Sequence, residues 1–184
     1  MLIDRNEKPT FESPQYIDNF LSDQEYTMIR NITMNEVERE FPYFPQRSVA
    51  YPGEEEKTGH WNWYATHSLY KHDRPTSPMC DPFYNIFARK FYEMGIMTSL
   101  MRIKANFYPW TETVREHPFH TDYDIPNHAA LFSVNTCDGY TEFEDGTKID
   151  SVANRLMFFD PQVKHRSTTT TTEYGRFNIN FNFL

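Results

Sequence analysis

Hydrophobic and polar residues alternate along much of the second half of the chain. The clearest case is residues 98–110, where one side of an extended chain carries Met101, Ile103, Ala105 and Phe107 and the other carries Arg102, Lys104, Asn106 and Tyr108. A period of two predicts a β-strand with one apolar face and one polar face. Four more strand-like segments are predicted, at residues 128–136, 140–144, 155–160 and 176–184.

Turn residues separate these segments. Asp145-Gly146 lies between residues 140–144 and 147–150, which is a strong signal for a β-hairpin. Pro161 follows the segment 155–160 and is expected to end that strand. The threonine run at residues 168–172 is expected to form the edge of a hairpin or a turn.

The first half of the chain carries helical patterns instead. Ser22 and Glu25 make a capping box for a helix predicted from residue 23 to about 34. A second helix is predicted within residues 77–95, with Asp81 as its N-cap, Pro82 in its first position and Gly95 at its end. Its apolar stripe is expected to pack against a sheet and consists of Phe83, Ile86, Phe87 and Phe91.

Residues 41–79 mix proline, glycine, acidic and aromatic residues without a clear period. One interpretation is a long surface excursion with one or two strands. The other is a lid or a wall of a substrate site, since long loops in compact domains often carry function. Both interpretations stay open from the sequence.

Helices first and short strands after predict a mainly β fold with flanking helices. The expected architecture is a double-sheet jelly roll, cupin-like, with helices packed on one sheet. A chain of 184 residues predicts a single domain, 1–184. Its helical and irregular part is expected at about 1–96 and its jelly-roll core at about 97–184.

Composition narrows the function classes. Aromatic residues make up 17% of the chain, which favours a core of Phe and Tyr on sheets. The net charge of −8, without a basic run, disfavours duplex nucleic acid as a partner. Two distant cysteines provide neither a disulfide framework nor a cysteine zinc site. The polar start and the lack of a long apolar run predict a soluble, cytoplasmic protein without membrane contact.

The candidate chemistry lies in the stretch EHPFHTDYD, residues 116–124. On an extended backbone, the side chains of His120 and Asp122 point the same way. His165 is a candidate third ligand, because two histidines and a carboxylate on one face of iron(II) leave coordination positions open for other ligands. Arg176 follows, and a guanidinium can hold a carboxylate through two parallel hydrogen bonds.

Neighbouring residues offer alternatives to this ligand set. His117 and Asp124 flank the motif, and either is a possible ligand by residue type. On a strand, however, His117 is expected to face away from His120. Arg166, next to His165, is likewise expected on the opposite side, in a surface ion pair.

The motif His120-x-Asp122, His165 and Arg176 resembles the iron(II)/2-oxoglutarate-dependent dioxygenases. YIDNFLSDQEY (16–26), GYTEFEDG (139–146) and NRLMFFDP with HRS (154–167) resemble the prolyl 4-hydroxylase-like branch. The resemblance implies a double-stranded β-helix core and Fe(II) held by His120, Asp122 and His165. It also implies 2-oxoglutarate and O2 as cosubstrates, with ascorbate as a supporting reductant.

Further matches concern the cosubstrate. Asn106-x-Tyr108 and Arg176-x-Asn178 resemble the AlkB-type demethylase branch, where such residues contact 2-oxoglutarate. Asn182 departs from that branch, which carries a second arginine there. The resemblance implies hydroxylation of a substrate with release of succinate and CO2.

The substrate expected from the resemblance is a prolyl or other peptidyl residue. The alternatives are a nucleobase demethylase, a small-molecule hydroxylase, and a jelly-roll protein that binds a ligand without catalysis. A peptide or a small molecule is thus the expected partner.

Overall fold

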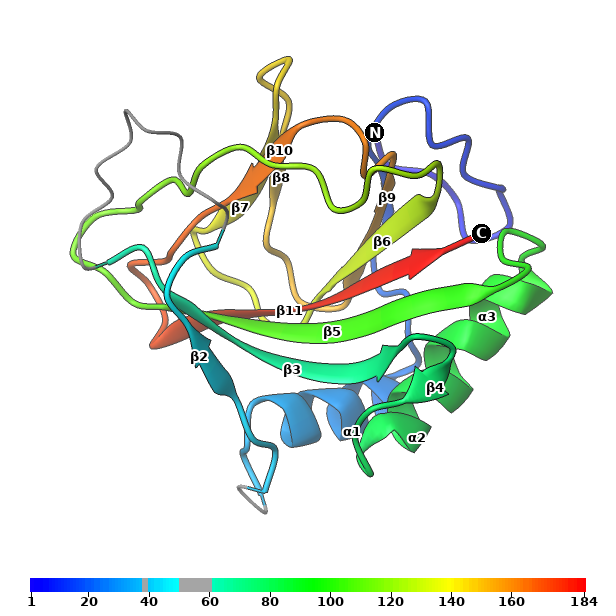
Figure 1. Cartoon of the computed structure of the whole chain (residues 1–184), viewed down its shortest axis with the longest axis horizontal. Coiled ribbons are helices and arrows are strands. Elements are labelled where there is room, and N and C mark those ends of the chain that lie inside the picture. The colour runs from blue at the N-terminus through cyan, green and yellow to red at the C-terminus, as the bar shows by residue number, and fades with distance from the viewer. Residues whose placement is uncertain (38–39, 50–60) are drawn as a thin grey trace.

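The structure is a computed structural model that describes residues 1–37, 40–49 and 61–184, and it is built on two antiparallel β-sheets (Figure 1). The main sheet has the strand order β1-β9-β6-β11-β5-β3-β2, with β4 paired to β3, and the minor sheet has the order β10-β7-β8. The strands of the main sheet are β1 (Gln15–Ile17), β2 (Phe44–Gln46), β3 (Tyr64–Lys71), β4 (Arg74–Pro75), β5 (Leu100–Pro109), β6 (His128–Ser133), β9 (Arg155–Phe159) and β11 (Gly175–Phe183). Those of the minor sheet are β7 (Tyr140–Phe143), β8 (Lys148–Asp150) and β10 (His165–Ser167). The predicted mainly β, two-sheet architecture is confirmed.

The long strands form where the sequence alternates. In β11, Phe177, Ile179, Phe181 and Phe183 belong to the apolar core. The residues between them are buried on the other face and are Arg176, Asn178, Asn180 and Asn182. β5 and β11 pair residue by residue, with Tyr108 opposite Arg176 and Asn106 opposite Asn178. The two polar faces therefore lie side by side.

The helices cover the apolar face of the main sheet (Figure 1). Helix α1 (Asp23–Thr33) starts with the predicted capping box, since Ser22 and Glu25 cap each other's backbone. Phe83, Phe87 and Phe91 of the second helical region are fully buried. The ring of Phe87 lies 4.6 Å from that of Phe181 on β11, which confirms that the predicted stripe packs against a sheet.

The second helical region differs from the prediction at its start and in its middle. It comprises α2 (Cys80–Phe83), a π-helical turn η1 (Tyr84–Ala88) and α3 (Arg89–Glu93). Met79 is the N-cap and makes no capping hydrogen bond through its side chain, so the assignment of Asp81 as the N-cap was wrong. Gly95 adopts φ of +66° just after α3, as expected for a helix end.

Residues 41–79 contain more regular structure than expected. Three strands occur in this range, and β3 pairs with β5 inside the main sheet. The prediction of one or two strands was therefore wrong. In β3 the buried face carries the polar His67 between Ala65 and Leu69, and the half-buried face carries Tyr64 and Tyr70, so the hydrophobic alternation is weak. Residues 50–60, on which the lid interpretation partly rests, lie outside the described residues, as do residues 38–39.

The minor sheet faces the other side of the main sheet (Figure 1). Its β7–β8 hairpin turns at Asp145-Gly146 as predicted, with Gly146 at φ of +85°. Phe143 and Ile149 of this sheet form an apolar cluster with Leu131, Met157 and Phe159 of the main sheet. The space between the sheets is thus apolar over β6 and β9 and polar over β5 and β11.

The threonine run is neither a hairpin edge nor a single turn. Thr168 and Thr170 form isolated bridges to Glu116 and Trp110 in the connection from β10 to β11. Thr170 also donates a hydrogen bond of 2.7 Å to the Asp138 carboxylate. The two bridges hold residues 110–116 along the polar side of the interior.

Within the described residues, no helix is both long and apolar enough to span a bilayer.

Candidate functional site

The three predicted metal ligands converge between the sheets. One ligand atom from each of His120, Asp122 and His165 lies within 4.8 Å of the other two. His120 and His165 face each other in an isolated antiparallel bridge, with backbone N–H···O distances of 2.9 and 3.0 Å. Residues 116–124 form no extended strand, contrary to the premise of the prediction. It is this bridge to β10 that places His120 beside His165.

Both histidines offer one ring nitrogen to the space between them. Nδ1 of His165 lies 2.9 Å from the carbonyl oxygen of Val163, and Nδ1 of His120 lies 3.4 Å from that of Pro118. A proton on each Nδ1 leaves Nε2 free as a metal ligand. Burial, followed by the neighbouring His165, lowers the pKa of His120 to about 4, so its ring is neutral at physiological pH.

The Asp122 carboxylate is fixed from several sides. Arg102 approaches Oδ1 at 2.9 Å, and the side-chain amides of Asn180 and Asn182 each approach Oδ2 at 3.2 Å. Burial alone raises the pKa of Asp122, but Arg102 and the neighbouring basic side chains of His165, Lys104 and His120 together outweigh it and hold the pKa well below the ordinary value. Asp122 is therefore an anion with a fixed orientation, which suits a divalent metal.

Arg176 lies in the same interior and is only 1% exposed. Its Nη1 donates to the carbonyl oxygen of Tyr140 at 2.7 Å, and its Nη2 donates to Oγ1 of Thr141 at 2.9 Å. Nε has no hydrogen-bond partner in the described part of the chain, and no carboxylate there pairs with this guanidinium. Burying an unpaired cation is costly, so this position suits the carboxylate of a bound ligand.

The other predicted cosubstrate residues line the wall beside Arg176. The Tyr108 ring centre is 5.6 Å from Cζ of Arg176, and burial raises the pKa of this tyrosine, so its hydroxyl stays a donor. Asn106 donates to Oδ1 of Asn178 at 2.8 Å, while its own Oδ1 is buried without a partner among the described residues. All four predicted cosubstrate residues therefore meet on one face.

His117 belongs to this interior, contrary to the expectation that it faces away. It is 1% exposed, and its ring centre is 5.4 Å from that of Tyr108. Nδ1 contacts the carbonyl oxygen of Ser167 at 2.9 Å, and Nε2 is buried without a partner among the described residues. The strand rule failed here because the segment is irregular. His117 and Asp124 are both outside the group of converging ligand atoms.

Arg102 and Lys104 also belong to the site, although the sequence prediction did not include them. They share the polar face of β5 with Asn106 and Tyr108, so the alternation itself was the signal. The ammonium group of Lys104 makes no hydrogen bond or ion pair with the described residues and lies 5.7 Å from the Tyr64 ring centre. Burial, with Arg102 nearby, lowers its pKa to about 7. Arg166 lies outside the interior and pairs with Glu116 and Glu142, as expected.

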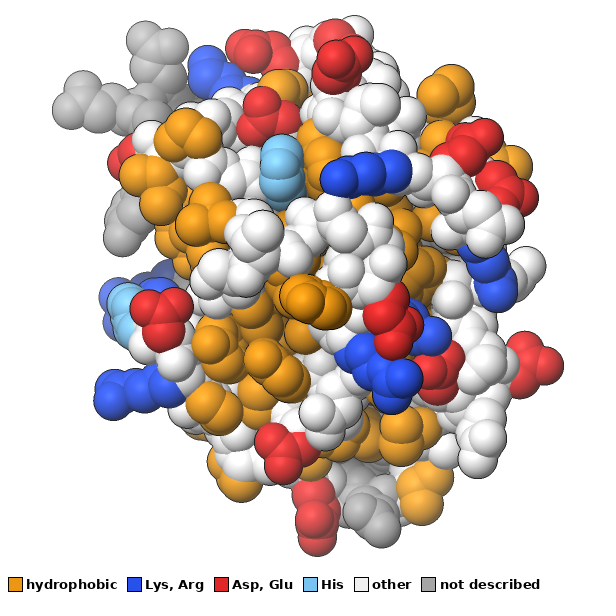
Figure 2. Space-filling view, turned by 90° about the vertical axis from the view of Figure 1, so that its right-hand side faces the viewer, with side chains coloured by type: hydrophobic (Ala, Val, Ile, Leu, Met, Phe, Trp, Pro, Cys, Tyr) orange, Lys and Arg blue, Asp and Glu red, His pale blue; other side chains and the backbone are white. Residues whose placement is uncertain are grey.

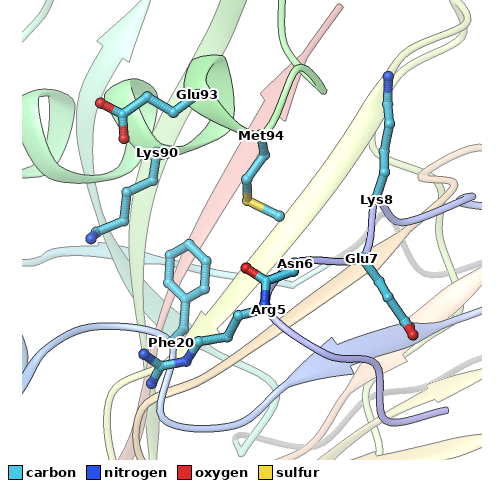
Figure 3. A pocket seen from close by; sticks show the side chains of 8 residues that line it. All are labelled: Arg5, Asn6, Glu7, Lys8, Phe20, Lys90, Glu93 and Met94. Carbon is cyan, nitrogen blue, oxygen red and sulfur yellow. The ribbon is translucent and has the colours of Figure 1, made fainter.

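A separate recess of about 450 Å³ lies between the N-terminal segment and α3 (Figure 3). It is open to solvent and carries charges of both signs; its lining residues are Arg5, Asn6, Glu7, Lys8, Phe20, Lys90, Glu93 and Met94. It contains no histidine and no group of metal-ligating side chains, so the interior between the sheets remains the candidate site.

Comparison with known proteins places the fold. No protein-family sequence model and no curated protein matches the chain by sequence. Solved structures do match: a Burkholderia pseudomallei oxidoreductase of the 2OG-Fe(II) oxygenase family has a TM-score of 0.66 at 10% identity, over 92% of this chain and 84% of that one. The chain has the fold of the 2-oxoglutarate/iron(II) oxygenases.

Prolyl hydroxylases are among the solved structures that share this fold. A Trichoplax adhaerens prolyl hydroxylase in complex with a hypoxia inducible factor peptide has a TM-score of 0.62 at 15% identity, over 92% of this chain and 83% of that one. A viral collagen prolyl hydroxylase from Paramecium Bursaria Chlorella virus-1, in a 2OG complex, has a TM-score of 0.57 at 12% identity, over 96% and 100%. The predicted likeness to the prolyl hydroxylase-like branch is thus borne out at the level of fold.

Proposed function

We propose that the protein is an Fe(II)- and 2-oxoglutarate-dependent dioxygenase that hydroxylates a prolyl or other peptidyl residue. The observation that carries the proposal is the convergence of His120, Asp122 and His165 in the interior that also buries Arg176, which has no carboxylate partner among the described residues. Two imidazoles and one carboxylate suit iron(II), and a buried guanidinium suits a dicarboxylic acid. The fold shared with prolyl hydroxylases supports the peptidyl substrate.

Different residues of the site would bind the metal and the cosubstrate. His120, Asp122 and His165 would hold iron(II), which with O2 and 2-oxoglutarate supplies the oxidant for a C–H bond while 2-oxoglutarate becomes succinate and CO2. Arg176 would pair with the distal carboxylate of 2-oxoglutarate, the one that does not bind the metal. Tyr108 would donate a hydrogen bond to the same carboxylate. Asn106 and Asn178 would order the same wall. Phe143 and Phe159 of the apolar cluster lie beside the His165 ring and would exclude water there.

Succinate release is the direct test. Purified protein with Fe(II), 2-oxoglutarate, ascorbate and air is expected to release succinate slowly even without substrate. Asp122→Ala is expected to abolish this release while circular dichroism shows a retained fold. Asp124→Ala is the matched control, because this exposed carboxylate lies two residues away and outside the ligand group. Turnover by Asp122→Ala at the wild-type rate would refute the metal site.

The substrate requires a second assay. Panels of proline-containing peptides, methylated oligonucleotides and small metabolites are compared for stimulation of succinate release and for a product one oxygen atom heavier. Stimulation by peptides is expected, and the net charge of −8 argues against the oligonucleotides. On the face shown in Figure 2, acidic and basic side chains are interspersed and hydrophobic ones gather across the middle. If only another panel stimulates, the peptidyl substrate is wrong and the oxygenase assignment stands.

A further inference from the structure

The carboxylate of Asp122 is held by side chains from two adjacent strands. Arg102 of β5 reaches Oδ1, and Asn180 and Asn182 of β11 both reach Oδ2. Arg102 and Asn182 are direct partners in the β5–β11 register. The contacts therefore arise from the pairing of the two polar strand faces, and they hold the carboxylate against the main sheet.

These contacts use most of what the carboxylate can accept. An ionised carboxylate has about four lone-pair positions on its two oxygens. Arg102, Asn180 and Asn182 occupy three of them. The described residues thus leave one position for a metal, so Asp122 is set up to bind through a single oxygen.

Arg102 is itself held in place. Its Nη2 also donates to Oδ1 of Asn180 at 2.8 Å, and its Cζ lies 5.0 Å from the centre of the Tyr123 ring. The ion pair is well buried, with side-chain exposures of 14% for Arg102 and 7% for Asp122. A planar guanidinium in such surroundings imposes an orientation that a flexible ammonium cannot.

We propose that Arg102 is a positioning residue that keeps Asp122 to one metal-ligand oxygen. A carboxylate free to turn can take two positions on a metal. Held by Arg102, the Asp122 carboxylate would occupy one coordination position and would leave the next one for the keto-acid end of 2-oxoglutarate. The inference rests on the proposed function, since it needs a metal at His120, Asp122 and His165.

The test measures binding in the absence of turnover. Mn2+ affinity of the metal-free protein and 2-oxoglutarate affinity of the Mn2+-loaded protein are determined by calorimetry without substrate. Arg102→Met is expected to weaken 2-oxoglutarate binding about 10-fold or more and to change Mn2+ affinity by a similar factor, as for other partners of metal ligands. The electron paramagnetic resonance spectrum of bound Mn2+ is expected to change as well, which a merely structural role would not cause.

Arg155→Met is the matched control. Arg155 also pairs with a carboxylate, Asp18, at 2.6 Å, and neither residue belongs to the ligand group. Its loss is expected to lower stability while both affinities stay within about twofold. Arg102→Lys is used if Arg102→Met does not fold. It keeps the charge but replaces the planar guanidinium, whose Nη2 makes both contacts, with a flexible ammonium, and about 10-fold weaker 2-oxoglutarate binding is expected.

The outcomes separate the two proposals. The role of Arg102 would be overturned if Arg102→Met kept the wild-type affinities for Mn2+ and 2-oxoglutarate and the wild-type Mn2+ spectrum. If only Arg102→Lys folds, the same result in that variant would overturn it. If wild-type protein binds Mn2+ no better than Asp122→Ala does, the metal site itself is wrong and the proposed function falls with it. Tight wild-type binding with a defect in the Arg102 variants supports both.

Discussion

At the scale of single residues, the interior depends on close contacts around Arg176. Gly139 lies so near that a Cβ there would be 2.8 Å from Cδ of Arg176 and 2.8 Å from the carbonyl oxygen of Thr169. Neither neighbour can yield freely, because the Arg176 guanidinium is hydrogen-bonded to Tyr140 and Thr141 and the Thr169 oxygen is a backbone atom. Gly139 is thus a packing requirement of the proposed carboxylate site.

Gly139→Ala is expected to displace Arg176 and raise the KM for 2-oxoglutarate about 10-fold or more, because small misplacements of a binding group are costly. The measurement is succinate release against 2-oxoglutarate concentration. Gly146→Ala provides the comparison: nothing lies within 4 Å of its Cβ position, but φ is +85°. It should cost about 1 kcal/mol of stability and leave the KM unchanged. An unchanged KM for 2-oxoglutarate in Gly139→Ala would contradict the assignment of Arg176 to the cosubstrate site.

Lys104 gives a prediction about pH. Its folded-state pKa of about 7 lies below the ordinary 10.5, so the unfolded chain binds the proton more tightly. The penalty on folding is fully present below about pH 7 and disappears as pH rises through about 10.5. Lys104→Met is expected to raise the free energy of unfolding by about 1–2 kcal/mol at pH 6.5, less than the full shift implies because the side chain is half-buried.

Denaturant unfolding at pH 6.5 and pH 10 measures this effect. The gain of Lys104→Met should shrink at the higher pH. Lys164→Met is the control, since Lys164 is exposed and pairs with the exposed Glu144; its change should stay within about 0.5 kcal/mol at both pH values. A stability gain for Lys104→Met that is equal at both pH values would contradict the assigned penalty.

At the scale of elements, the sequence predicted what depends on local pattern. β5 and β11 follow from alternation, α1 from its capping box, and the β7–β8 hairpin from Asp145-Gly146. The π-turn η1 and the pairing of β3 with β5 depend on tertiary packing, which carries no local signal.

The site shows the same division between local and long-range information. The ligand residues were readable from type and spacing, but the reason His120 meets His165 is a bridge between distant segments. The sequence could not show to which side His117 points, because side chains alternate between two faces only in regular strands. The inward face of Arg102 was readable, but its partner Asp122 is set by the arrangement of an irregular loop.

At the scale of the whole molecule, the main sheet separates stability from chemistry. On β11, Phe181 faces the helices, while its neighbours Asn180 and Asn182 face the Asp122 carboxylate. The Phe181 ring contacts Phe87, at 4.6 Å between centres. The helix layer therefore supports the strand that carries the site without contributing a side chain to it.

Phe87→Ala tests this separation. Phe87 is fully buried, and its loss is expected to lower the free energy of unfolding by about 3–5 kcal/mol, measured by denaturant titration. The protein that remains folded is expected to bind Mn2+ within about twofold of wild type, because the sheet backbone keeps Asn180 and Asn182 in register with β5. Phe87→Leu, which keeps more of the apolar volume, should lose less stability and bind Mn2+ equally well. A fall in Mn2+ affinity that tracks the loss of stability across the two variants would show that the two faces of the sheet are coupled.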